Sequence, residues 1–277
     1  MEDLNYSEVE EHIVAWLKDY AAEARVKGFV IGISGGVDSA VVSTIAAKTG
    51  LKLYTIQMPI RQKSDEVSRA TSHINWLMEN YPNVSTINCD LTNTFESFLG
   101  NVEIVEDVEK QNMAEANTRS RLRMVALYYH ASIKNCLVLG TGNKVEDFGI
   151  GFFTKFGDGG VDVSPIGALM KSQVRELARH MGVSEVIVNA VPTDGLWEDG
   201  RGDEWQIGAT YDELEWAMDE TEFNPHGINA HRYTDRMKKV MEIYLTRHFA
   251  NKHKMALPPV CNIDSIKGYA FSPKFPK

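Results

Sequence analysis

Strand-length apolar segments alternate with segments of helical spacing through the first half of the chain. The apolar segments lie at 29–33, 51–58, 84–87 and 137–139. They are too short to span a bilayer, and helix-length segments separate them. This alternation is typical of a parallel sheet whose crossover helices cover both faces. We therefore predict an α/β fold: a doubly wound, mainly parallel sheet with helices on both faces, plus a helical C-terminal appendage.

Spacing and end signals mark the expected helices. A capping box at Ser7 and Glu10 predicts the start of the first helix, and Gly28 predicts its end. A second capping box, at Thr210 and Glu213, predicts a helix in the C-terminal part. Further helices are expected at about 38–48, from Ser64 onwards, and at about 112–134, 170–181 and 230–249.

The expected strand order places a ligand site. Ligands of such sheets bind beyond the carboxyl ends of the strands, where the strand order reverses. If the first three strands run outward and the fourth returns across the first, the turns after Ile33 and Leu139 share one crevice. The segment 195–208 mixes acids, glycines and tryptophans, and we expect a mobile lid there. Without internal repeats or linkers, residues 1–277 are expected to form a single domain.

Charge and cysteine usage exclude several classes of protein. The net charge is −9, whereas nucleic acid and membrane surfaces favour a basic face, so neither partner is expected. Cys89, Cys136 and Cys261 lie far apart, without a CxxC pair or Cys/His cluster, so neither a zinc site nor a disulfide framework is indicated. The acidic N-terminus lacks an apolar signal segment, and we expect a cytoplasmic location.

A glycine-rich turn follows the first strand directly, with the sequence Ser34-Gly35-Gly36-Val37-Asp38-Ser39. Its two glycines allow several backbone N–H groups to point at one anion, and the following helix adds its dipole. No lysine follows, so this is not the loop that grips a β/γ-phosphate pair. A carboxylate at position 38 would repel phosphate unless Mg²⁺ lay between them. The alternative is a plain strand–turn–helix with position 38 or 39 as N-cap; the preceding buried strand favours a Mg²⁺–pyrophosphate site.

The same six residues resemble the signature of the N-type ATP-pyrophosphatases. Later segments narrow the resemblance to the ammonia-dependent NAD synthetases, in family order and over nearly the whole chain. These segments are GTGNKVED at 140–147, GFFTKFGDGGVD at 151–162, RSRLRM at 119–124, KSQ at 171–173, PTD at 192–194 and HK at 253–254. The resemblance implies the adenine nucleotide alpha-hydrolase-like form of the predicted sheet.

The resemblance also implies roles for individual residues. It assigns ATP binding to Gly32, Ile33, Ser34, Gly35, Gly36, Val37, Asp38, Ser39, Thr141, Lys171 and Thr193. It assigns the deamido-dinucleotide to Arg121, Lys155, Asp162, His253 and Lys254. Asp38 and Glu146 are expected to bind Mg²⁺, and Asp38 and Lys171 to act in catalysis.

Each match has a simpler structural alternative. Asp158-Gly159 is also the sequence of a hairpin turn, and Phe152 or Phe153 also suits the core. Arg121 and Arg123 equally suit the solvated face of a long helix, and Glu146 a solvated loop.

One segment departs from the commoner bacterial pattern, which reads Gly-Thr-Asp-His-Ala-Ala-Glu and reaches Gly-Phe-Phe one residue sooner. Here Asn143, Lys144 and Asp147 replace that chemistry. Glu146 keeps its spacing from Thr141, so the metal assignment holds.

The implied reaction is amidation of deamido-NAD through an acyl-adenylate, by a homodimer, as the last step of NAD biosynthesis. Free ammonia, or ammonia from a separate glutaminase subunit, is the expected nitrogen source. The rivals are a GMP synthetase-like amidase, a tRNA thiolase and a nucleotide sensor without turnover. A thiolase would normally show paired cysteines and a basic surface, which this chain lacks.

Overall fold

Four parallel strands form the centre of the molecule. The computed structural model describes residues 4–62, 64–193, 202–224 and 230–261. The strands are β1 (Gly28–Gly32), β2 (Lys52–Gln57), β3 (Val84–Asn88) and β4 (Leu137–Val138). Their order is β3-β2-β1-β4, so the fourth strand returns across the first, as predicted. Val30 pairs with Tyr54 on one side and with Val138 on the other, all in parallel.

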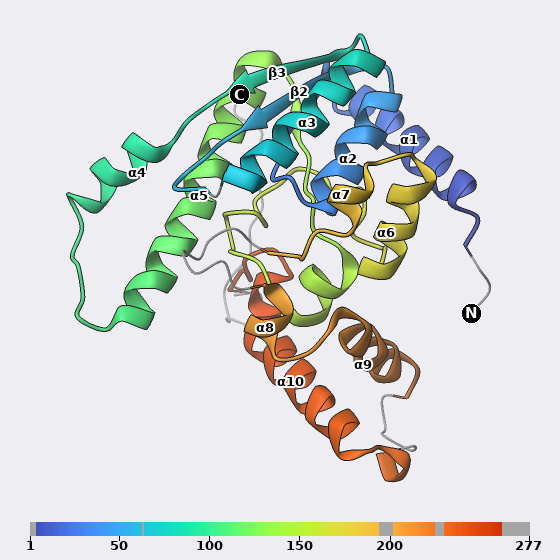
Figure 1. Ribbon diagram of the computed structural model, residues 1–277, viewed down its shortest axis with the longest axis vertical. Helices are drawn as coiled ribbons and strands as arrows, with labels where there is room; N and C mark the ends of the chain where they lie inside the picture. The colour runs from blue at the N-terminus through green and yellow to red at the C-terminus, as the bar shows by residue number, and fades with distance from the viewer. Residues whose placement is uncertain (1–3, 63, 194–201, 225–229, 262–277) are drawn as a thin grey trace, which may run out of the picture.

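Helices cover both faces of the sheet, which confirms the doubly wound α/β prediction (Figure 1). They are α1 (Tyr6–Glu23), α2 (Val37–Lys48), α3 (Ser64–Asn80), α4 (Thr92–Leu99), α5 (Val108–Lys134), α6 (Lys171–His180), α7 (Glu185–Val188), α8 (Asp203–Ile207), α9 (Tyr211–Phe223) and α10 (Asp235–Asn251). A π-helix, η1 (Lys144–Ile150), and two 3-10 turns, η2 (Ala230–Arg232) and η3 (Lys252–Lys254), complete them.

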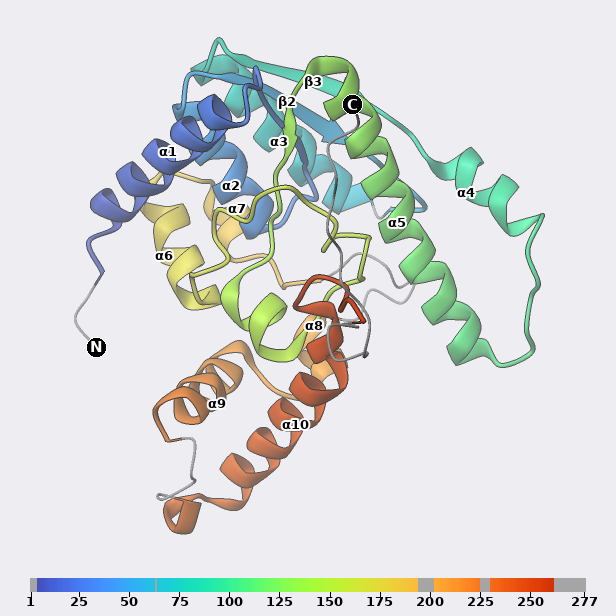
Figure 2. The same cartoon turned by 180° about the vertical axis from the view of Figure 1, so that it is seen from behind.

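Side chains of β1 alternate between two cores. Phe29 and Ile31 pack with α1, α2, α3, α6 and α7, whereas Val30 faces the opposite side and packs with α4 and α5. The view from behind shows α5 and the α1–α2–α6 group on opposite flanks of the sheet (Figure 2). Burial on both faces explains why the strands read as continuous apolar runs.

A third core lies below the sheet. It joins η1, α8, α9 and α10, with Tyr211, Leu214 and Tyr244 fully enclosed. In Figure 1 α9 and α10 extend away from the sheet as a pair, which confirms the expected C-terminal helical appendage. Thr210 and Glu213 form the predicted capping box at the start of α9. Within the described residues no helix is long and apolar enough to cross a membrane.

The ends of the first helix differ from the prediction. Its N-cap is Asn5, whose side chain accepts from the backbone N–H groups of Ser7 and Glu8, so the expected capping box at Ser7 and Glu10 is wrong. The helix ends at Glu23, and Gly28 instead begins β1. A Cβ at Gly28 would lie 1.9 Å from a backbone oxygen of β2, so glycine is needed there for strand contact.

One helix is absent from the prediction, and the starts of two others shift. The helix α4 was not predicted, and α5 begins at Val108, capped by Asp107, rather than near 112. The last helix starts at Asp235 instead of 230, because Thr234 accepts from the backbone of Met237. Half of the expected lid, residues 195–201, lies outside the described residues. Its end forms α8, where Asp203 and Ile207 are buried, so this part belongs to the core.

Candidate functional site

The turn between β1 and α2 presents backbone N–H groups at the carboxyl end of the sheet. Gly35 has a φ of +87°, and a Cβ there would lie 2.7 Å from the carbonyl oxygen of Glu66 on α3, so glycine is required. Ser34 Oγ accepts from the N–H of Gly36 at 3.2 Å and lies 3.1 Å from Ser39 Oγ. Among the residues that the structure describes, no side chain caps the start of α2, so the N–H groups of its first turn can bind an anion.

The ammonium of Lys171 joins two carboxylates that come from different helices, Asp38 in the first turn of α2 and Glu146 in η1. Its Nζ lies 2.5 Å from Asp38 Oδ2 and 3.0 Å from Glu146 Oε1. The lysine side chain is only 3% exposed. Burial alone would lower the pKa of Lys171, but the carboxylates of Asp38 and Glu146 outweigh burial and raise the pKa above its ordinary value. Glu146 therefore lies opposite Asp38, as expected, and both acids converge on one cation.

Asn143 fixes the relative position of these two acids. Its side chain is fully buried. Its Nδ2 donates to Asp38 Oδ1 at 3.2 Å, while its Oδ1 accepts from the backbone N–H of Glu146 at 3.1 Å. The second bond also caps the start of η1. Such π-helical turns are frequent at functional sites.

The glycine at position 142 has a structural explanation. A Cβ at Gly142 would lie 1.9 Å from Asp147 Oδ2, so the carboxylate of Asp147 fills the space beside this glycine. The commoner pattern carries an acid at the position of Gly142. Here the acid that fills this space comes from Asp147, one turn later in the chain.

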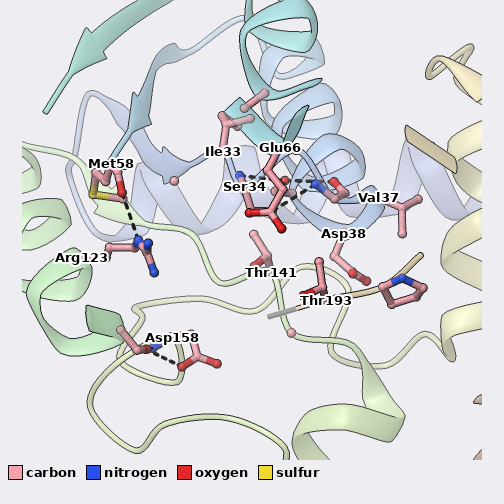
Figure 3. A pocket seen from close by; sticks show the side chains of 18 of the residues that line it. Ile33, Ser34, Val37, Asp38, Met58, Glu66, Arg123, Thr141, Asp158 and Thr193 are labelled. Carbon is pink, nitrogen blue, oxygen red and sulfur yellow. Dashed lines mark hydrogen bonds between the residues drawn. The ribbon is translucent and has the colours of Figure 1, made fainter. Parts of the chain in front are cut away.

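The turn, the two acids and the lysine line one cavity of about 290 Å³. All residues predicted to bind ATP line it, including Thr141 and Thr193. Figure 3 shows Thr141, Thr193 and Asp38 close together below Ser34. On the opposite wall, Arg123 Nε donates to the carbonyl oxygen of Met58 at 3.1 Å (Figure 3). The crevice predicted between the turns after β1 and β4 is thus present.

Four of the residues predicted to bind the dinucleotide lie together outside this cavity. Arg121 Nε donates to the carbonyl oxygen of Lys155 at 3.3 Å, and Lys155 Nζ donates to that of His253 at 2.8 Å. Lys254 Nζ donates to the carbonyl oxygen of Phe153 at 2.7 Å and lies over its ring. These contacts join α5, the segment after η1 and the turn η3, which follows α10.

Asp162 and Asp158 hold the loop 151–162 in place. Asp162 Oδ2 accepts from the backbone N–H of Val138 in β4 at 2.7 Å, and Oδ1 accepts from Tyr128 Oη at 3.1 Å. Asp158 Oδ1 accepts from Ser120 Oγ at 2.6 Å and lines the cavity. It is therefore tied to α5, beyond what a plain hairpin turn requires.

The family model described as NAD synthase matches residues 9–258. This chain belongs to the NAD synthase family.

Relatives within the NAD synthase family cover most of the chain. An NH(3)-dependent NAD(+) synthetase of Carboxydothermus hydrogenoformans is 39% identical over 76% of this chain and 85% of its own length. An NH(3)-dependent NAD(+) synthetase of Syntrophomonas wolfei is 37% identical over 94% of this chain and 98% of its own length. The solved structure of an NMN synthetase from Francisella tularensis is 31% identical, with a TM-score of 0.79, covering 94% of this chain and all of that one.

Two residues of this NAD synthase site were missed by sequence reasoning. Asn143 was recognised only as a departure from the commoner loop. No sequence pattern marks Tyr211, although its hydroxyl donates to Glu146 Oε1 at 2.5 Å. Its capping-box neighbour Thr210 located the start of α9 but gave no sign that the next side chain points into the site.

Proposed function

We propose that this chain is an ammonia-dependent NAD⁺ synthetase, a ligase that forms a C–N bond. It amidates deamido-NAD at the expense of ATP and gives NAD, AMP and pyrophosphate. The observation that carries the proposal is Lys171 held between Asp38 and Glu146 at the mouth of a glycine-rich turn, in a member of this family.

The reaction begins with a carboxylate, which is a poor electrophile because its charge repels nucleophiles and oxide is a poor leaving group. A carboxylate oxygen of deamido-NAD attacks the α-phosphorus of ATP, and pyrophosphate leaves. Ammonia then attacks the acyl carbon, AMP departs with that oxygen, and the attacking nitrogen loses a proton. The protein contributes positioning and charge neutralisation rather than covalent chemistry.

Each part of the cavity has a place in this reaction. The N–H groups of the turn at 34–39 bind the phosphates that leave as pyrophosphate. The ammonium of Lys171 offsets charge on the phosphates. Thr141 and Thr193 bind ATP from the cavity wall that they line.

The donor set also suits Mg²⁺. Asp38 and Glu146 supply carboxylate oxygens, which Mg²⁺ prefers, and they already face a common cation in Lys171. Mg²⁺ usually takes one or two protein carboxylates and completes its shell with phosphate oxygens and water. When bound, it would neutralise phosphate charge between these two acids.

We assign deamido-NAD to the group formed by Arg121, Lys155, His253 and Lys254, with Asp162. Three of the first four side chains are fixed cations, which suits a diphosphate. Both oxygens of Asp162 already hold β4 and α5, so its contribution to the substrate site includes holding the loop 151–162.

The homodimer is proposed from α5. Val125, Tyr129 and Ile133 recur at helical spacing and are 57%, 64% and 60% exposed. Arg121 lies four residues before Val125 and therefore on the same face of α5. A second subunit bound to this apolar face would lie beside the proposed dinucleotide site. We place this biosynthetic enzyme in the cytoplasm, where ATP and the dinucleotide occur.

The Francisella tularensis relative, an NMN synthetase, favours a second candidate, the same amidation on the mononucleotide. Both are tested by incubation with ATP, Mg²⁺ and ammonium, with either deamido-NAD or nicotinate mononucleotide. We expect equimolar NAD, AMP and pyrophosphate, and a higher kcat/KM for the dinucleotide. A higher kcat/KM for the mononucleotide supports the second candidate. Turnover only with xanthosine monophosphate or tRNA, or nucleotide binding without pyrophosphate release, would overturn both.

A further inference from the structure

Tyr211 reaches the acidic site from the C-terminal appendage. Its side chain is 1% exposed, and its hydroxyl donates to Glu146 Oε1 at 2.5 Å. The same hydroxyl lies 3.3 Å from Asp203 Oδ2. Its ring lies below the ammonium of Lys171, with 4.9 Å from Nζ to the ring centroid. One tyrosine therefore contacts the cation and one of the acids of the site.

The position of Tyr211 is itself fixed by polar contacts. Its backbone N–H donates to Glu204 Oε1 of α8 at 2.9 Å. One turn later on α9, Glu215 accepts from both the N–H and the Oγ of Ser172, at 2.8 and 2.6 Å. Ser172 directly follows Lys171 at the start of α6. The first turns of α9 thus hold Glu146 directly, through Tyr211. They hold Lys171 indirectly, through the contact of Glu215 with Ser172.

The hydroxyl also leaves one oxygen of Glu146 for a ligand. Oε1 accepts from both Tyr211 Oη and Lys171 Nζ. Among the described residues, Oε2 accepts no hydrogen bond, and the side chain lines the cavity. The phenol of Tyr211 therefore holds one oxygen of this carboxylate and leaves the other without a donor from the described part of the protein.

We propose that Tyr211 is a positioning residue for Glu146: by holding Oε1, it leaves Oε2 directed at the place where the cavity would bind a divalent cation. The inference rests on the proposed function, in which Asp38 and Glu146 bind Mg²⁺. It adds a residue of α9 to a site whose charged groups otherwise come from the starts of α2, η1 and α6. Partners that orient a metal-binding carboxylate typically contribute tenfold or more to metal affinity.

The test is direct binding of Mn²⁺, a paramagnetic substitute for Mg²⁺, to the full chain with α,β-methylene-ATP, with free Mn²⁺ measured by electron paramagnetic resonance. Tyr211→Phe removes only the hydroxyl and keeps the ring below Lys171. Tyr244→Phe is the matched control, because Tyr244 is 3% exposed in the same core and its hydroxyl makes no hydrogen bond within the described residues. We expect the Kd for Mn²⁺ to rise about tenfold in Tyr211→Phe and to stay unchanged in the control.

Equal Mn²⁺ affinity in wild type and a folded Tyr211→Phe would overturn the role of Tyr211 while leaving the metal site intact. No Mn²⁺ binding by the wild type would instead overturn the metal site itself, and the inference with it. If Tyr211→Phe did not fold, site-specific 3-fluorotyrosine at 211 would keep the hydroxyl and change its donor strength. An unchanged Kd for Mn²⁺ in that protein would likewise contradict the proposal.

Discussion

Asn143 reaches Asp38 across 105 positions of sequence, with its Nδ2 3.2 Å from Asp38 Oδ1. Its Oδ1 accepts from the backbone of Glu146, so one buried amide holds the acid that follows β1 near the acid of η1. Opposite charge on Lys171 alone would pull both acids inward without fixing their orientation. The amide supplies that orientation.

Replacement of Asn143 by Ala is expected to lower both stability and turnover. The variant loses the cap of η1 and a hydrogen bond to a charged acceptor, together about 2–3 kcal/mol in the free energy of unfolding. Asn251→Ala is the control, because Asn251 donates to the carbonyl oxygen of Ile150 at the other end of η1 and does not touch Asp38. Urea unfolding and kcat measure the two effects; equal losses of kcat in both variants would contradict a specific role for Asn143.

Replacement of Gly35 by Ala is expected to raise the KM for ATP strongly. The new Cβ would meet the backbone of α3 at 2.7 Å, in a conformation of positive φ. Gly50→Ala is the matched control: Gly50 has a φ of +74°, but its Cβ would meet no atom within 4 Å. Both variants should lose about 1 kcal/mol of stability from backbone strain, so a similar KM for ATP in the two would show that the turn does not bind phosphate.

The stability of the protein should fall in mild acid because of His73. Burial lowers the pKa of His73 from 6.5 to about 4. Between these values the unfolded chain binds a proton that the folded chain does not, so the free energy of unfolding falls as pH decreases. The slope is about 1.4 kcal/mol per pH unit, or about 3 kcal/mol in total.

The contribution of His73 is isolated by comparison with His73→Gln. Urea unfolding of both proteins between pH 7 and 4.5 gives the difference in free energy. This difference should change with pH below about 6.5. A difference independent of pH would mean that the folded protein protonates His73 normally.

Replacement of Lys254 by Met is expected to raise the KM for deamido-NAD by about tenfold or more, with the KM for ATP unchanged. Lys254 lies with Lys155 and His253 outside the ATP cavity, so loss of its charge should weaken only diphosphate binding. Lys238→Met, an exposed lysine of α10 paired with Asp235, is the control. Steady-state kinetics with each substrate varied in turn give the two KM values. A matching rise in the KM for ATP would refute the separation of the two sites.

The turn at 34–39 was predictable because its signals are local. A buried strand, two glycines and the start of a helix follow one another within ten residues, and each has a steric reason. The strand order followed from the assumption that the fourth strand returns across the first, which the pairing of Val30 with Val138 shows.

Tyr211 was not predictable in this way, because its contact with Glu146 joins positions 65 apart through packing of α9 on η1. No periodicity encodes that contact. The sequence of α4 does carry helical signals: Asp90 accepts from the backbone of Thr92, and Leu91, Phe95 and Leu99 recur at helical spacing. Asn5 shows a different limit, since several residues at the start of α1 can serve as caps and only their geometry selects one.

The proposed reaction requires transfer of a carboxylate oxygen to the α-phosphorus of ATP beside Lys171, Asp38 and Glu146. The most direct measurement uses deamido-NAD labelled with ¹⁸O in its carboxylate, with ATP, Mg²⁺ and ammonium, and mass spectrometry of the products. We predict one ¹⁸O atom in each AMP and none in pyrophosphate. Label in inorganic phosphate with release of ADP, or unlabelled AMP, would contradict the acyl-adenylate and the site built around it.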